Sequence, residues 1–145
     1  MMRRVVITGV GAVTPIGNTA KEMWAGVREG KCGIDKITKY DISNRKVKVA
    51  AEVKNLPVEE LVDKHDLRKM DLFCAFAMIA ADEAIADSGL SFDGEEDKCG
   101  VIVSSGIGGI STIEKEYSKG LEKGFDRVSP YFIPSVITNM AAGRI

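Results

Sequence analysis

The chain has 145 residues, of which 45% are hydrophobic and 28% charged, and its formal net charge is −1. This composition is typical of a globular chain rather than a disordered one, and the length suits one domain with a sizeable core. The near-zero charge gives no general attraction to nucleic acid or to an anionic membrane. Three widely spaced cysteines and a single histidine argue against a zinc site and fit a reducing cytoplasm.

The first expected element is a strand at residues 3–8, RRVVIT, whose β-branched run suits a central strand covered on both faces. Glycines and Pro15 then punctuate a loop, GVGAVTPIGN. This loop invites comparison with the GxGxxG fingerprint of dinucleotide-binding domains. Thr14 stands where the third glycine should be, however, and no acidic residue follows at the end of a second strand. A nucleotide site therefore stays a minor alternative.

Helix-capping residues and alternating hydrophobicity predict the next elements. Thr19 and Glu22 have the spacing of a capping box and predict a helix that Gly30 ends. Residues 46–53, KVKVAAEV, alternate in hydrophobicity, which predicts a half-exposed strand at a sheet edge or in a hairpin. Pro57 can begin a short helix.

Residues 67–87, LRKMDLFCAFAMIAADEAIAD, predict the central helix. The run from Met70 to Ala86 is apolar on almost every side, and Gly89 follows as a C-terminal cap. A membrane span is the competing interpretation. Four carboxylates interrupt the run: Asp71, Asp82, Glu83 and Asp87. Because carboxylates are costly in mid-bilayer, we expect a core helix that is buried between two layers.

The remaining elements are again a strand followed by helices. Residues 100–105 predict a second buried strand, and Ser111 with Glu114 predicts a capping box that starts a helix running toward Lys119. Pro134 can begin a last helix that runs through Ala142. Strands alternating with helices predict an α/β fold with a mostly parallel sheet. Two central strands cannot cover the main helix on both sides, so we expect apolar cover from outside these residues.

Four segments together resemble the opening of the β-ketoacyl-acyl carrier protein synthases, specifically the type II form. They are RRVVITGVGAVTPIGN at 3–18, RKMD at 68–71, SSGIGG at 104–109 and SPYFIPSVITNMAAG at 129–143. The resemblance implies the thiolase-like fold, a layered αβαβα architecture of which residues 1–145 would form the N-terminal half. In that fold the central helix layer is covered on both faces.

The resemblance also implies a decarboxylating condensation, which needs an activated cysteine and two histidines. It implies no cofactor, because the substrates are carried on the phosphopantetheine of acyl carrier protein. None of the three cysteines here follows a Thr-Ala pair, and His65 lies in a polar link. We therefore expect a portion of the enzyme that lacks the nucleophile and is inactive alone. A non-catalytic partner resembling the chain-length factors is the alternative.

Three apolar residues receive pocket roles from the resemblance. Ile107 matches a residue that lines the acyl pocket and gates chain length. The sequence alone favours a different interpretation, an apolar side chain packing a glycine-rich turn, and the resemblance reverses that preference. Phe132 and Ile133 match residues that close the partner's acyl pocket across a homodimer interface. The apolar loop between two prolines independently suggests an interface.

Four basic residues receive binding roles. Lys64, Arg68 and Lys69 cluster at the start of the central helix, a pattern that by itself indicates a solvated helix end. In the family, the matching region docks the acidic carrier protein, and such cations can steer an acidic partner. Arg127 matches a second basic contact, contributed by the neighbouring subunit.

Overall fold

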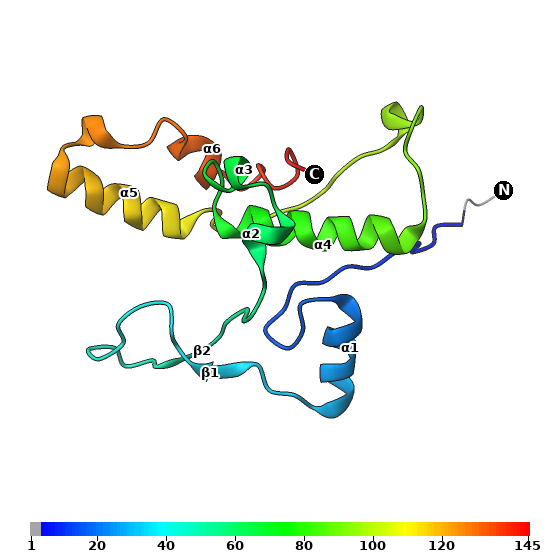
Figure 1. The fold of residues 1–145 in the computed structure, drawn as a ribbon, viewed down its shortest axis with the longest axis horizontal. Coiled ribbons are helices and arrows are strands. Elements are labelled where there is room, and N and C mark those ends of the chain that lie inside the picture. Colours follow the sequence, from blue (N-terminus) through cyan, green and yellow to red (C-terminus); the bar gives the residue numbers. More distant parts are fainter. Residues whose placement is uncertain (1–3) are drawn as a thin grey trace. The chain divides into compact units, whose positions relative to one another are not determined.

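The computed structural model describes residues 4–145, so that Arg3 of the expected first strand lies outside the described residues. The chain divides into two compact units. One comprises residues up to 56 together with 80–89, and the other comprises 57–79 together with 90–145. Helix α4, Leu72–Ser88, contributes residues to both (Figure 1).

The N-terminal unit begins its regular structure with α1, Ala20–Glu29. The predicted capping box is confirmed in part, because Thr19 Oγ1 accepts from the Glu22 amide at 3.1 Å. The Glu22 carboxylate, however, accepts from the Asn18 amide at 2.8 Å, one residue earlier than the motif expects. Gly30 ends the helix with a φ of 67°, a left-handed conformation that suits glycine.

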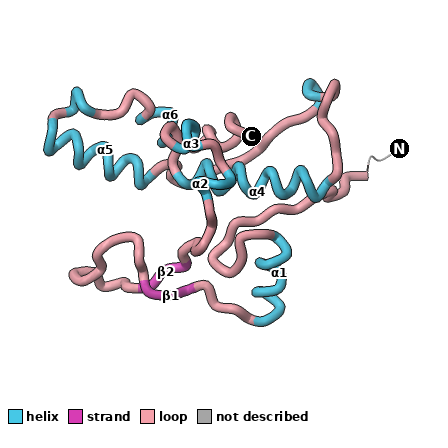
Figure 2. The backbone as a smooth tube through the Cα atoms, viewed as in Figure 1, coloured by secondary structure: helices cyan, strands magenta, loops and turns pink. Residues whose placement is uncertain are grey.

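Strands β1, Ile34–Lys36, and β2, Val49–Ala51, pair antiparallel, with Ile34 opposite Ala51. They form the only sheet among the described residues (Figure 2). This pairing confirms the hairpin prediction for 46–53, although the strand itself is shorter than expected.

The prediction of two buried strands is wrong. Neither 4–8 nor 100–105 is a strand, and the side chains of Val5 and Ile102 are 95% and 98% exposed. A β-branched run is buried only when neighbouring strands and covering helices are present. Within the described part of the chain, neither segment has a paired neighbour.

Helix α4 confirms the predicted central helix from Leu72 onward, whereas residues 68–71 are not helical and Leu67 belongs to a separate short helix. Gly89 follows α4 with a φ of 63°. The helix is not buried all round: Cys74 and Ala75 are fully buried, whereas Leu72 and Ile85 are exposed. The C-terminal unit has one core cluster, formed by Val62, Met70, Cys74, Ala75 and Ala141. No helix in the described range is both long and apolar enough to cross a membrane.

Two carboxylates of α4 hold the N-terminal loop. Asp87 accepts from the Val10 amide at 3.0 Å, and Glu83 accepts from the amides of Ala12 at 2.8 Å and Ala20 at 2.9 Å. The sequence alone suggested only that these residues interrupt an apolar helix. They instead anchor a glycine-rich loop and the start of α1.

Two glycines of the same loop lie directly against the α4 backbone. A Cβ on Gly9 would lie 2.1 Å from the Ala84 carbonyl oxygen, and one on Gly11 would lie 1.9 Å from that of Ala80. The absence of side chains at these positions therefore permits close packing between the loop and the helix.

The C-terminal unit contains α2, Val58–Leu61, as predicted from Pro57, and α3, Lys64–Leu67. After a short helix η1, Glu96–Lys98, comes α5, Ile110–Lys123. The predicted Ser111–Glu114 capping box does not form, because α5 begins one residue earlier, at Ile110, and its N-cap Gly109 has no side chain to cap it.

Helix α5 continues past the predicted end at Lys119. Gly120 lies inside it, and a Cβ there would meet the Phe125 ring at 2.5 Å, so this glycine makes room for the next turn. Helix η2, Phe125–Arg127, and α6, Phe132–Val136, follow. Helix α6 is earlier and shorter than the predicted one, because the backbone becomes extended at Ile137.

Candidate functional site

The turn that carries Ile107 is held against α6. The Gly109 amide donates to the Val136 carbonyl at 3.1 Å. Gly108 has a φ of 79°, and a Cβ there would lie 2.0 Å from the same oxygen. The Ile107 side chain is exposed beside this contact. The structure thus brings the Ile107 turn to the helix that carries Phe132 and Ile133.

Phe132 and Ile133 open α6, the first half-buried and the second exposed. The turn leading to them is organised by Ser129, whose Oγ accepts from the Tyr131 amide at 3.1 Å and whose carbonyl accepts from the Phe132 amide at 2.9 Å. The Ser129 amide in turn donates to Glu116 Oε2 at 2.7 Å. Residues 129–133 are therefore connected to α5.

Glu116 lies on α5 and is only 7% exposed. Besides the Ser129 amide, its carboxylate contacts Lys119 Nζ at 3.1 Å. The hydrogen bond from Ser129 and then that from Lys119 lower the pKa of Glu116 below its ordinary value. Sequence reasoning missed this residue, because a glutamate on an amphipathic helix is indistinguishable from a solvated one.

Asp71 immediately precedes α4 and caps α5. Its Oδ2 accepts from both the amide and the hydroxyl of Thr112, each at 2.8 Å. A negative group at this position satisfies one of the free amides of the first helical turn and complements the helix dipole. Gly109 allows this approach, since a Cβ there would lie 2.9 Å from the Asp71 Cβ.

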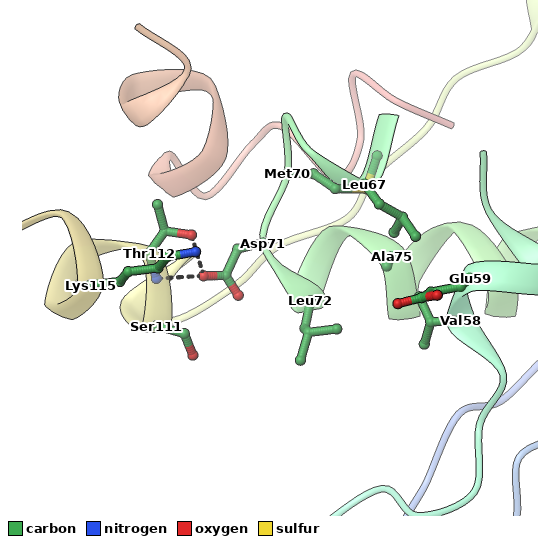
Figure 3. A pocket seen from close by; sticks show the side chains of 10 residues that line it. All are labelled: Val58, Glu59, Leu67, Met70, Asp71, Leu72, Ala75, Ser111, Thr112 and Lys115. Carbon is green, nitrogen blue, oxygen red and sulfur yellow. Dashed lines mark hydrogen bonds between the residues drawn. The ribbon is translucent and has the colours of Figure 1, made fainter. Parts of the chain in front are cut away.

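Figure 3 shows the cavity beside this cap, which has a volume of about 360 Å³. Its apolar wall comes from α2, α3, α4 and the link between the last two: Val58, Leu67, Met70, Leu72 and Ala75. Its polar side is formed by Glu59, Asp71, Ser111, Thr112 and Lys115. None of the residues predicted for the acyl pocket or carrier binding lines it.

Of the three predicted basic residues around α3, Lys64 and Arg68 are exposed and Lys69 is half-buried. Lys69 Nζ lies 3.2 Å from His65 Nδ1 and 5.6 Å from the centre of the Tyr131 ring. The structure thus connects the predicted carrier-binding cluster to the segment that holds Phe132 and Ile133.

Two arginines differ in their relation to this cluster. Arg144 contacts the Asp66 carboxylate at 3.3 Å and donates to the Lys69 carbonyl at 3.4 Å, which fixes the corner between α3 and α4. Sequence reasoning did not single it out. Arg127 lies exposed in η2, outside the cluster around α3.

The three cysteines are free. Cys74 is fully buried, and burial raises the pKa of its thiol, so it packs in the core as a neutral side chain. Cys32 and Cys99 are exposed. Across residues 4–145, no group of three or more histidine, cysteine or acidic side chains is placed to hold a metal ion.

Comparison with known proteins decides the family. Residues 2–145 match the family model described as Beta-ketoacyl synthase, N-terminal domain. The chain belongs to this family. The β-ketoacyl synthase domain is 44% identical over 144 residues to a 3-oxoacyl-[acyl-carrier-protein] synthase 2 of Staphylococcus aureus strain N315, covering 99% of this chain and 35% of that protein.

A protein of the same name from a Synechocystis strain is 42% identical over 142 residues, covering 97% of this chain and 34% of its own length. The β-ketoacyl synthase domain described here thus spans about a third of these relatives.

Solved structures agree with this assignment. The ishigamide ketosynthase/chain length factor superposes with a TM-score of 0.78 at 26% identity, covering 97% of this chain and 36% of that one. A type II polyketide ketosynthase in complex with its acyl-carrier protein gives 0.80 at 25% identity, covering 99% and 39%. The β-ketoacyl synthase domain therefore has the predicted thiolase-like α/β fold of the N-terminal half.

Proposed function

We propose that this chain is the N-terminal part of a type 2 3-oxoacyl-acyl carrier protein synthase, which elongates fatty acids as a cytoplasmic homodimer. The observation that carries the proposal is the 44% identity over 99% of the chain to a synthase of that name.

In the proposed reaction, an acyl group moves from the carrier thioester to a cysteine thiolate and releases the carrier thiol. Malonyl-carrier protein then loses carbon dioxide, and its carbanion attacks the acyl-enzyme thioester. A carbon–carbon bond forms and the cysteine thiolate leaves, which yields 3-oxoacyl-carrier protein. The 145 residues contain no Thr-Ala-Cys sequence, so we assign the nucleophile to none of them and expect this portion alone to be inactive.

The proposed contribution of this portion is to the acyl pockets of the dimer: Ile107 lines the pocket of its own subunit, and Phe132 and Ile133 close the pocket of the partner. Support comes from the Gly109–Val136 hydrogen bond, which joins the two segments that carry these residues. All three side chains are apolar, as an acyl chain requires.

The second proposed contribution is carrier-protein docking by Lys64, Arg68 and Lys69, with Arg127 acting from the neighbouring subunit. The exposure of Lys64 and Arg68 supports this role, because exposed cations attract an acidic partner. The solved complex of a polyketide ketosynthase with its carrier protein supports docking of this kind.

The test reverses two charges, Arg68→Glu with Lys69→Glu, in the native polypeptide, meaning the whole synthase of which we propose that these residues are the N-terminal part. We expect kcat/KM for acyl-carrier donors to fall on the order of 10- to 100-fold, with little change for acyl-CoA donors, because only the carrier needs the basic surface. Reversal of the exposed pair Lys46 and Lys48 is the matched control. An equal loss with both donors would contradict docking, and the absence of condensation by the unaltered protein would contradict the enzyme assignment.

A non-catalytic partner remains the second candidate, because one structural neighbour is described as a ketosynthase/chain length factor. Incubation with carrier protein that bears a labelled acyl group distinguishes the enzyme from the chain-length factor. An enzyme retains label as a covalent thioester after denaturation, whereas a chain-length factor retains none.

A further inference from the structure

The buried carboxylate of Glu116 is the starting point. Two other glutamates of α5, Glu114 and Glu122, are exposed, as charged groups on a helix normally are. Removing a carboxylate from water is unfavourable unless strong hydrogen bonds replace the lost hydration. Glu116 obtains them from the Ser129 amide at 2.7 Å and from Lys119 Nζ at 3.1 Å. The bond to Ser129 crosses from α5 to a different segment of the chain.

Ser129, held by Glu116, in turn binds the residues that follow it. Its Oγ and its carbonyl accept the amides of Tyr131 and Phe132 at 3.1 and 2.9 Å. One carboxylate thus fixes the residue that shapes the entire turn before α6. Figure 1 shows this segment, in orange, returning along α5 toward α6.

The far end of the same segment is fixed at the beginning of α5. The Val136 carbonyl accepts the Gly109 amide at 3.1 Å, two residues from Ile107. Residues 129–136 are therefore held at one end by Glu116 and at the other by the Ile107 turn. Because α5 joins these two attachment points, it fixes where Phe132 and Ile133 lie on the subunit that presents them to the partner's pocket.

We infer that Glu116 is a positioning residue that sets the preferred acyl chain length by holding residues 129–134 against α5. The inference rests on the proposed function, since it takes Phe132 and Ile133 to close the partner's acyl pocket. Residues at the far wall of a pocket contact only chains long enough to reach them. Loosening that wall should therefore weaken the binding of long donors and leave short ones unaffected.

The test uses the native polypeptide and two substitutions of similar size. Glu116→Leu removes both hydrogen bonds, whereas Glu116→Gln keeps an oxygen that can accept from the Ser129 amide. We expect Glu116→Leu to raise KM for long acyl-carrier donors relative to short ones by about fivefold to tenfold, with kcat unchanged. Glu116→Gln should retain most of the preference for long donors, with a shift of only about twofold in the ratio of long-donor to short-donor KM. Glu114→Leu, an exposed position on the same helix, is the matched control and should change neither.

Amide hydrogen exchange supplies a readout of the segment itself. Peptides covering 129–134 should exchange faster in Glu116→Leu than in the unaltered protein, whereas those of α1 should not. An unchanged ratio of long to short donors, or an equal loss for all lengths, would overturn the inference. If Glu116→Leu does not fold, Glu116→Gln decides, and a ratio identical to that of the unaltered protein overturns it. Failure of the proposed function is distinguishable, because the unaltered protein would then condense no donor.

Discussion

Replacing Asp71 with alanine should release the first turn of α5. Its Oδ2 accepts two hydrogen bonds from Thr112, both 2.8 Å long, and no side chain of α5 supplies an alternative cap. Each bond to a buried carboxylate is worth roughly 1.5 kcal/mol, so the loss is about 3 kcal/mol. At about 1.4 kcal/mol per factor of ten, the local opening constant should rise roughly 100-fold.

The assay is amide hydrogen exchange at Thr112 in the native polypeptide at neutral pH. Thr112→Val removes the hydroxyl bond but keeps the amide, so it should raise exchange only about tenfold. In the Asp71→Ala background, the same substitution should add little, because its partner is already absent. Asp71→Asn retains an acceptor and should lie near the unaltered protein. Exchange in Asp71→Ala within threefold of the unaltered rate would refute the cap.

Three further predictions concern other parts of the chain. Ile107→Phe should shorten the acyl chains accepted, because bulk enters the proposed pocket; an unchanged product length by mass spectrometry contradicts that role. Gly11→Ala should lower Tm by several degrees, since its Cβ would lie 1.9 Å from the Ala80 carbonyl, whereas Gly100→Ala meets no atom within 4 Å and should be neutral. The pKa of Glu116 is lowered from 4.5, so its stabilising effect is complete above that pH and is lost as the pH falls below it. The protection of the 129–134 amides, measured relative to their intrinsic exchange rates at each pH, should therefore fall in acid, and Glu116→Gln should lack this pH-dependent fall.

Short-range sequence signals predicted local structure well. The helix 72–88 and its Gly89 cap follow from helix propensity and from the absence of interruptions over 17 residues. The two proposed capping boxes had different outcomes. Thr19 caps its own helix, but α5 takes its cap from Asp71, 41 residues away from Thr112, and no local spacing encodes that.

The predicted buried strands failed for a related reason. A β-branched run such as 4–8 indicates that a segment is suited to burial, but it does not specify which strand pairs with it. Carboxylates were equally ambiguous. Glu83 and Glu116 bind backbone amides 71 and 13 residues away, yet in the sequence they resemble the solvated glutamates beside them. The roles of Ile107, Phe132 and the basic cluster around Lys69 stay predictions.

The attachment of the N-terminal loop to α4 constrains the order of events during synthesis. Val10 donates to a carboxylate 77 residues later, so translation at roughly 5–20 residues per second separates the two groups by about 4–15 s. Throughout that interval, the loop emerges from the ribosome with no helix to receive it. Its glycines and the apolar run of Val5 and Ile7 then remain accessible to nascent-chain chaperones until α4 is made.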